Sequence, residues 1–270
     1  MAEISVFLQS VKLPVMPEVA HALIRTLNNE DAEVTKVRDV IAKDPALTAT
    51  LLRMANSAIF GLSRTVDTLD KAVSVVGMSH IRARALSICM ANVFVLPPGI
   101  HRLEFWRNSM ACAGYAHWLA AALQMDEQQA WLTGMMLRLG EITIAQHSPE
   151  LLPGIEKKPC LPGMRWQRER QLAGFDEGQI TAEIAKRWDF PDTMVQALRA
   201  GGAPLATPEF SRLGAVVHLA GWLADTPTFA ADTLTQLPVP VVQALGLDLQ
   251  TLTASIPDAD AISDTSSLIG

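Results

Sequence analysis

The chain has few of the features that mark secreted, disulfide-stabilised or membrane-spanning proteins. Its 270 residues include three cysteines, which are far apart and form no CxxC pair, so neither a disulfide framework nor a zinc site is expected. The N-terminus, MAEISVFLQS, lacks the basic start and long apolar core of a signal peptide. The longest uncharged apolar run, 85–100, contains two prolines and is too short to cross a bilayer. We therefore expect a cytoplasmic protein with no membrane insertion.

The sequence also has little that is typical of β-structure. Tyrosine occurs once and phenylalanine eight times, and no long segment alternates Val, Ile or Thr with polar residues. Alanine, leucine and methionine are plentiful, and 49% of the residues are hydrophobic. This composition predicts a folded, all-α protein.

Positive charge is missing from the C-terminal end. The net charge is −6, and no lysine or arginine follows Arg212, whereas six aspartates do. Such a chain is poorly suited to general nucleic-acid binding, which we do not expect. There is also no Gly-rich phosphate loop and no G-x-S-x-G nucleophile motif.

Helical periodicity divides the chain into two sets of helices. Val95-Leu96-Pro97-Pro98-Gly99 interrupts the pattern, because successive prolines cannot continue a helix. We predict an N-terminal helical subdomain over 1–98, a second over 99–250, and a flexible acidic tail over 251–270. The expected helices are 17–27, 34–43, 45–55, 68–76 and 79–94, then 103–124, 126–147, 164–172, 176–189, 191–200, 209–223 and 239–245.

The most informative stretch is 44–61, DPALTATLLRMANSAIFG. Asp44 is suited to cap a helix, and Pro45 fits its first position. The polar residues Arg53, Asn56 and Ser57 follow where the apolar helix runs out. They predict either a helix C-cap and turn, or a switch that contacts a partner or the second subdomain.

This stretch resembles the HDOD family, bacterial signalling modules related to metal-dependent HD phosphohydrolases. The resemblance extends to Leu13-Pro14-Val15-Met16-Pro17 upstream and to TLDKAVSVVG over 68–77 with Arg82 downstream. It covers roughly residues 8–250 and implies an N-terminal helical subdomain packed on a degenerate HD-like subdomain.

The residues that would bind metal in an HD domain are replaced in this chain. The run 134–140, GMMLRLG, resembles the family pattern G-L-L-H-D-I-G. Leu137 and Arg138 stand where that pattern has its His and Asp. Leucine, glycine and arginine offer a divalent metal no usable lone pair. The resemblance therefore implies no metal, no cofactor and no catalytic residue in a degenerate pocket formed by Asn108, Leu137, Arg138, Glu177, Gly201, Gly202 and Gly221.

Two of these replacements carry opposite charge. In the ancestral arrangement the ligands at 138 and 177 converge on one metal, so the resemblance implies that Arg138 and Glu177 lie close together. An ion pair would then tie the same helices together in place of the metal. The alternative is a repurposed pocket that binds a small anion through Arg138.

The predicted function is that of a non-enzymatic bacterial signalling or adaptor module acting through protein–protein contact. Family members are associated with two-component and cyclic-di-GMP pathways, so a protein of such a pathway is the expected partner. A small-ligand sensor of a nucleotide or anion is the first alternative, and a residual metal-dependent phosphohydrolase is the second. A group of basic residues predicts either solvated helix faces or a docking surface for an acidic partner or for a phosphorylated or cyclic-nucleotide ligand. Its members are Arg53, Arg64, Lys71, Arg82, Arg84, Arg102 and Arg107.

Overall fold

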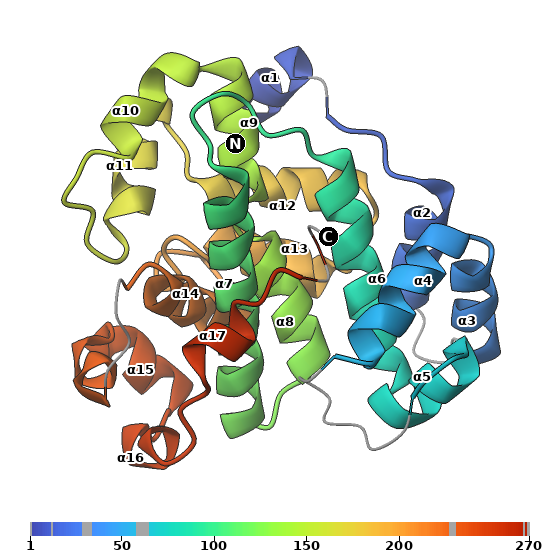
Figure 1. Ribbon diagram of the computed structural model, residues 1–270. Helices are drawn as coiled ribbons and strands as arrows, with labels where there is room; N and C mark the ends of the chain where they lie inside the picture. The colour runs from blue at the N-terminus through green and yellow to red at the C-terminus, as the bar shows by residue number, and fades with distance from the viewer. Residues whose placement is uncertain are drawn as a thin grey trace.

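The computed structural model describes residues 2–11, 13–28, 34–57, 65–226, 231–266 and 268. Within these ranges all regular secondary structure is helical, which confirms the all-α prediction (Figure 1). The first helices are α1 (Ala2–Ser10), α2 (Glu18–Leu27), α3 (Val34–Ala42), α4 (Pro45–Ala55), α5 (Leu69–Val76) and α6 (Met78–Val93).

The remaining helices begin after the prolines near residue 98. They include two 3₁₀ segments, η2 and η3. In chain order they are α7 (Arg102–Ala122), α8 (Glu127–Met136), α9 (Leu139–His147), η2 (Pro149–Leu151), α10 (Leu152–Ile155), α11 (Met164–Ala173), α12 (Glu177–Arg187), α13 (Asp192–Ala200), α14 (Arg212–Ala224), η3 (Ala231–Gln236), α15 (Val239–Leu245), α16 (Leu249–Thr253) and α17 (Ala259–Ile262).

Side-chain caps explain where several helices begin. The Asp44 carboxylate accepts hydrogen bonds from the backbone N–H groups of Ala46 and Leu47, each at 3.0 Å, and Pro45 opens α4. Asp176 caps α12 in a capping box with Gln179. These carboxylates satisfy backbone donors that the first turn of a helix leaves free.

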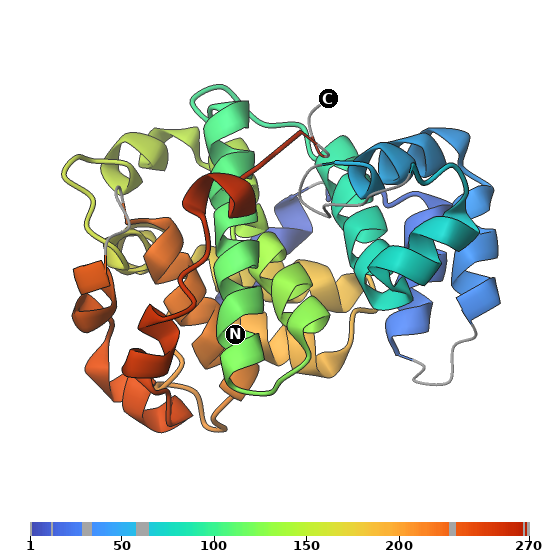
Figure 2. The same cartoon turned by 60° about the horizontal axis from the view of Figure 1, so that its bottom comes forward.

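Helix α7 is the centre of the larger half of the molecule. It packs against α8 on one side and α14 on another, and Figure 2 shows it upright in the middle of the fold. Helices α2 to α6 form a separate group to one side, and α6 contacts α8. One continuous hydrophobic core runs through both groups, so the two subdomains are packed together rather than linked loosely.

Helix α1 packs on the second subdomain, although it belongs to the predicted range 1–98. The Phe7 ring lies 4.7 Å from the His147 ring and 4.8 Å from the Phe175 ring, measured between centroids. The Arg187 guanidinium also donates to the carbonyl of Leu8 at 3.3 Å. The chain therefore starts on one subdomain and crosses to the other at α2.

The described part of the predicted tail, 251–270, contains the end of α16 and the whole of α17. Helix α17 packs on α7. Ile262 sits against Gly114, where an added Cβ would lie 2.5 Å from the Ile262 Cβ. Trp118 donates its indole N–H to the Ser255 hydroxyl at 3.1 Å. We call residues 254–266 the C-terminal strap, because they run across α7 in both ribbon views.

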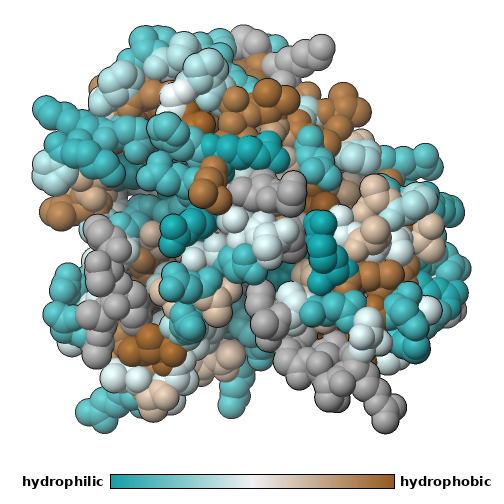
Figure 3. All heavy atoms as spheres, viewed as in Figure 1, coloured by the Kyte–Doolittle hydropathy of each residue, from teal (hydrophilic) through white to brown (hydrophobic). Residues whose placement is uncertain are grey.

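The surface shown in Figure 3 mixes hydrophilic and hydrophobic residues. Within the described residues, no helix combines the length and the apolar character needed to cross a bilayer.

Candidate functional site

The degenerate pocket is built around a break between α8 and α9. The sequence predicts one helix over 126–147, but the structure ends α8 at Met136 and restarts at Leu139. Thr181 of α12 reaches into the break, where its hydroxyl oxygen lies 3.0 Å from the carbonyl oxygen of Leu137 and 2.8 Å from the N–H of Gly140. A neighbouring helix thus satisfies the interrupted backbone, and Leu137 and Arg138 sit at the break.

Leu137 packs against three glycines, Gly178 of α12, Gly201 after α13 and Gly221 of α14. A Cβ added at Gly201 would lie 2.7 Å from the Leu137 Cδ1, and one at Gly221 would lie 3.0 Å from its Cδ2. Gly221 also faces the Trp166 indole, at 2.9 Å from the same added Cβ. Leu137 and Trp166 therefore occupy the space that side chains at these glycines would need.

Gly202 has an equally close environment. An added Cβ there would lie 2.3 Å from the Asp176 Oδ2 and 2.8 Å from the Arg170 Nη1. Those two side chains form an ion pair at 2.5 Å. Gly201 thus makes room for the Leu137 side chain, and Gly202 makes room for the ion pair between Arg170 and Asp176.

Arg138 and Glu177 come together, as the sequence predicts, but not as an isolated pair. The Arg138 Nε lies 3.9 Å from the Glu177 Oε2, whereas its Nε and Nη2 both lie 3.0 Å from the Glu141 Oε2. A third carboxylate, Asp225, lies 3.7 Å from the Arg138 Nη1. Arg138 therefore faces three carboxylates, and Glu141 is its principal partner.

The principal cation for Glu177 is Arg165, which the sequence analysis did not identify. The Arg165 Nε lies 3.1 Å from Glu177 and 3.2 Å from Glu169, and its Nη2 lies 3.1 Å from Glu141. Arg165 also contacts Glu156 at the rim of the site. Its side chain is only 4% exposed, so a desolvated guanidinium joins three acidic residues from α9, α11 and α12.

The Glu177 carboxylate is held by hydrogen bonds from neighbouring protein groups. Its Oε1 accepts the Trp166 indole N–H at 2.9 Å, and its Oε2 accepts from the Arg165 Nε. The Glu177 backbone N–H donates to Glu169 at 2.8 Å. Both oxygens of the Glu177 carboxylate are thus hydrogen-bonded within the protein.

Burial and neighbouring charge move the pKa values of this cluster in opposite directions. Burial raises the pKa of Glu169 well above its usual value, and the Glu177 carboxylate raises it further. Burial also raises the pKa of Glu177. Burial acts the same way on Glu141, but the guanidiniums of Arg138 and Arg165 outweigh it and lower the pKa of Glu141.

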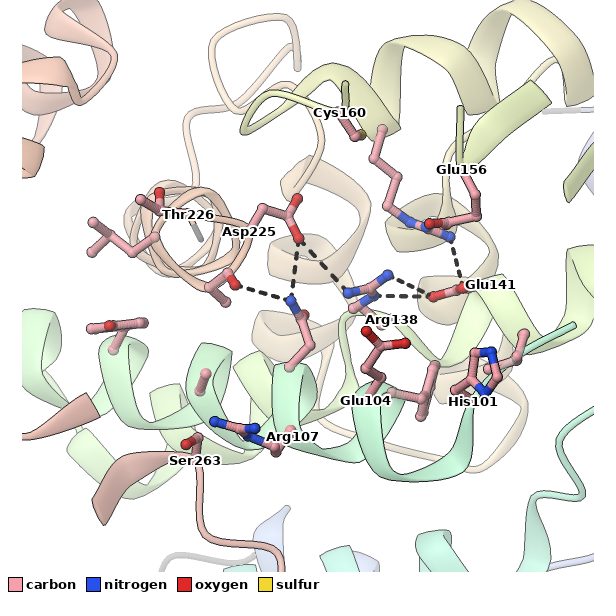
Figure 4. Close-up of a pocket in the computed structure, with 18 of the residues that line it drawn as sticks. His101, Glu104, Arg107, Arg138, Glu141, Glu156, Cys160, Asp225, Thr226 and Ser263 are labelled. Carbon is pink, nitrogen blue, oxygen red and sulfur yellow. Dashed lines mark hydrogen bonds and ion pairs between the residues drawn. The ribbon is translucent and has the colours of Figure 1, made fainter. Parts of the chain in front are cut away.

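Next to this cluster lies a cavity of about 790 Å³ (Figure 4). Glu104 and Arg107 reach it from α7, Arg138 and Glu141 from the break, and Asp225 from the end of α14. The C-terminal strap lines it through Ala259, Asp260 and Ser263. The cavity contains acidic and basic groups in nearly equal number.

Asn108 lies at the wall of this cavity and ties α7 to the end of α14. Its amide donates to the carbonyl of Ala224 at 3.0 Å and to the Asp225 carboxylate at 3.3 Å. His218, on the apolar helix α14, packs in the core: its Nδ1 lies 2.7 Å from the carbonyl oxygen of Gly201, and burial lowers its pKa to about 4.

The residues at the end of α4 lie in the other subdomain. Asn56 bonds the returning chain: its amide donates to the Val66 carbonyl and its oxygen accepts the Val66 N–H, each at 2.7 Å. Arg53 is exposed, and the Ser57 hydroxyl is buried without a hydrogen bond to any described residue. The geometry gives Asn56 a structural role, and residues 58–61 lie outside the described residues.

The predicted basic group does not form one surface. Lys71 pairs with Asp67, and the Arg84 guanidinium stacks on the Trp131 ring at 3.3 Å. Arg107 points toward the C-terminal strap, and Arg64 lies outside the described residues.

Sequence reasoning missed Glu141, Arg165, Trp166 and Glu169. A signal was present for Glu141, which is three residues after Arg138 and so on the same helix face. Arg165 and Glu169 also form an i, i+4 pair of opposite charge. Because α11 is strongly polar, that pair resembles an ordinary surface pair until the fold buries it.

The site does not fit the metal that HD-type chemistry requires. In the described part of the chain, no three His, Cys, Asp or Glu side chains converge as a metal site. The carboxylates that do converge are separated by Arg138 and Arg165, whose positive charges repel a divalent cation.

Comparisons with known proteins agree with this fold. The chain is 24% identical over 214 residues to an uncharacterised protein of Treponema pallidum, covering 77% of this chain and 41% of that protein, so it spans less than half of that relative. A Shewanella amazonensis structure described as a candidate phosphohydrolase has a TM-score of 0.81 at 26% identity, covering 98% of both chains.

A second structure, described as a candidate signal transduction protein of Marinobacter aquaeolei, has a TM-score of 0.78 at 21% identity, covering 97% of this chain and 64% of that one. The family model for the HDOD domain matches residues 13–204. This match covers more than half of the chain, so the chain belongs to the HDOD domain family.

Proposed function

We propose that this chain is a non-catalytic signalling module that acts by binding a protein partner. The proposal rests on one observation above all: Leu137 and Trp166 fill the space next to Gly201 and Gly221. In a hydrolytic HD domain, the resemblance puts metal ligands at 137, 201 and 221. An HD-type hydrolase needs a metal ion that lowers the pKa of a bound water. Here apolar side chains take the place of the ligands.

The ion network supports the same proposal. Glu177, the predicted position that still carries a carboxylate, is bonded to Arg165 and Trp166. Two buried guanidiniums and three glutamates join α9, α11 and α12 through ion pairs that need no bound metal. We therefore assign this cluster to holding the helices together.

We place the module in a bacterial two-component or cyclic-di-GMP pathway, with a cytoplasmic signalling protein as its partner. HDOD membership supports a signalling role. The Marinobacter structure, which covers nearly all of this chain, carries a signal-transduction description.

A second candidate function is favoured by the cavity of about 790 Å³, a volume suited to a small ligand. Its occupant would be a nucleotide or another small molecule. Binding of an anion through Arg138 has less support, because Glu141, Glu177 and Asp225 already surround that guanidinium. A thermal-shift screen with nucleotides tests this candidate, and a rise in Tm that saturates with concentration would establish it.

The primary test is metal analysis and phosphodiesterase assay on the purified chain. We expect no stoichiometric Mn, Fe, Zn or Mg, no change in Tm when these are added, and no hydrolysis of bis-p-nitrophenyl phosphate or cyclic-di-GMP. One equivalent of metal that is lost in Glu177→Gln, together with hydrolysis, would overturn the non-catalytic proposal. Gln keeps an acceptor for the Trp166 N–H, so this variant removes the charge with little change in packing.

A further inference from the structure

The groove between α2 and α3 gathers positive side chains at the edge of the molecule far from the cavity. It encloses about 270 Å³ and is lined by Arg25, Lys36 and Lys43, and Glu18 is the one acidic residue among its described lining. Figure 2 shows these two helices at the outer edge of the N-terminal subdomain. The rest of the lining is Ala22, Thr26 and Val40.

The cations of this groove differ from their neighbours in lacking acidic partners. Arg38 and Lys71, in the same subdomain, pair with aspartates at 2.9 Å or less. Arg25, Lys36 and Lys43 form no ion pair with any residue that the structure describes, and all three are exposed. Their charges are therefore not neutralised by described neighbours within the subdomain.

A fourth cation lies behind the groove. The Arg82 Nη1 donates to the carbonyl of Thr26, a lining residue, at 3.0 Å. The Arg82 Nε is buried without a hydrogen bond to any described group. Since an arginine side chain stays protonated at neutral pH, this guanidinium adds a fixed positive charge behind the groove.

The charge of the whole chain makes this groove distinctive. At a net charge of −6, most of the molecule repels an acidic partner. Among the residues that the structure describes, the groove lining has three cations against one carboxylate, with Arg82 bonded to its Thr26 carbonyl. The Debye length of about 8 Å at physiological salt keeps distant acidic residues from cancelling these charges. An acidic partner is consequently steered toward this end of the molecule.

We propose that the α2–α3 groove is a docking site for an acidic segment of a protein partner, whose carboxylate or phosphoryl oxygens bind Arg25, Lys36 and Lys43. This deepens, and rests on, the proposed function as a protein-binding module. The groove is concave, so a side chain can enter it, whereas a flat anionic membrane surface reaches only its rim.

The test uses the full chain and a hexaglutamate peptide with a carbodiimide cross-linker, which joins a carboxylate to a lysine amine only where the two are in contact. Mass spectrometry then maps the peptide. We expect it on Lys36 and Lys43 and not on Lys157 or Lys186, which are exposed lysines elsewhere. A hexaglutamine peptide is the uncharged control for binding, and a phosphoserine peptide, with affinity measured by fluorescence anisotropy, tells which oxyanion binds more tightly.

A matched pair of triple variants measures the contribution of the groove. Exposed ion pairs are individually weak, so Arg25→Gln/Lys36→Gln/Lys43→Gln should lower peptide affinity about tenfold at low salt. The control Lys157→Gln/Lys186→Gln/Arg212→Gln makes the same change in net charge at exposed sites and should lower it by about twofold or less. Unchanged Tm values show that both variants fold.

The docking proposal would be overturned if the two triple variants lost peptide affinity equally, or if the cross-links were spread over all lysines. Stronger binding to phosphatidylserine vesicles than to peptide, through the same residues, would replace the protein partner by a membrane. None of these outcomes bears on the metal and phosphodiesterase assays, so failure of the groove and failure of the non-catalytic proposal are distinguishable.

Discussion

Replacing Arg165 by methionine is the sharpest test of the buried ion network. The Arg165 guanidinium lies 3.1 Å from Glu141 and Glu177 and 3.2 Å from Glu169. Methionine keeps much of the length and apolar packing of the side chain while removing the charge. The variant therefore leaves three buried glutamates with Arg138 as their remaining described cation.

The expected cost follows from the burial of these partners. The three glutamate side chains are at most 6% exposed, so water cannot replace the lost guanidinium. Removing one member of a buried ion pair costs about 3–5 kcal/mol, a large part of the roughly 5–15 kcal/mol that stabilises a typical protein. The contact with Glu156 adds little, because that carboxylate is 44% exposed.

Urea denaturation followed by circular dichroism measures this loss. The control is Arg212→Met at an exposed position, which should change the free energy of unfolding by no more than about 0.5 kcal/mol. Adding Glu177→Gln to Arg165→Met should recover part of the loss, because it removes one uncompensated charge. If Arg165→Met costs no more than the control, or if the two changes are strictly additive, the network does not act as the distances indicate.

Three further predictions concern other parts of the structure. Burial raises the pKa of Glu169 in the folded chain above the value near 4.5 that it has in the unfolded chain. Protonated Glu169 therefore contributes fully to the free energy of unfolding below pH 4.5, and this contribution is lost as the pH rises through the folded-state pKa. Relative to the parent chain, Glu169→Gln should thus be more stable at about pH 8 than at about pH 5, and identical pH profiles would contradict this. Gly221→Ala should cost about 1–3 kcal/mol by crowding Trp166 and Leu137, and adding Gly221→Ala to a Leu137→Ala chain should cost less than adding it to the parent, because one of the two contacts is gone, as urea midpoints will show. Asn56→Ala should lower Tm and lower signalling output only in proportion to the folded fraction, because its amide holds Val66; a larger fall in output would restore the switch hypothesis.

The sequence predicts helices well where local signals act alone. Helix α4 runs over 45–55 as predicted, since Asp44 caps it and its apolar residues repeat at helical spacing. The break at Leu137 and Arg138 was missed, because both are good helix formers and neither is a proline or a glycine. The hydroxyl of Thr181, 44 residues from Leu137 in the sequence, bonds the interrupted backbone instead.

The candidate site was predictable to a similar degree. Motif positions identify Arg138 and Glu177 as replacements and bring them near each other, but they give no information on the new partners. Arg165 and Trp166 reach Glu177 from α11, a helix whose polar composition suggests a surface position. Contacts of this kind depend on how helices pack, which no spacing in the sequence specifies.

The close fit of Leu137 to its glycines restricts how this lineage can change. A side chain restored at Gly201 or Gly221 alone would collide with Leu137, and at Gly221 with Trp166 as well. A histidine restored at 137 alone would find glycines, not ligands, beside it. A single substitution that adds a side chain at Gly201 or Gly221 should therefore lose stability, and a set of metal ligands in this cluster would need several simultaneous changes.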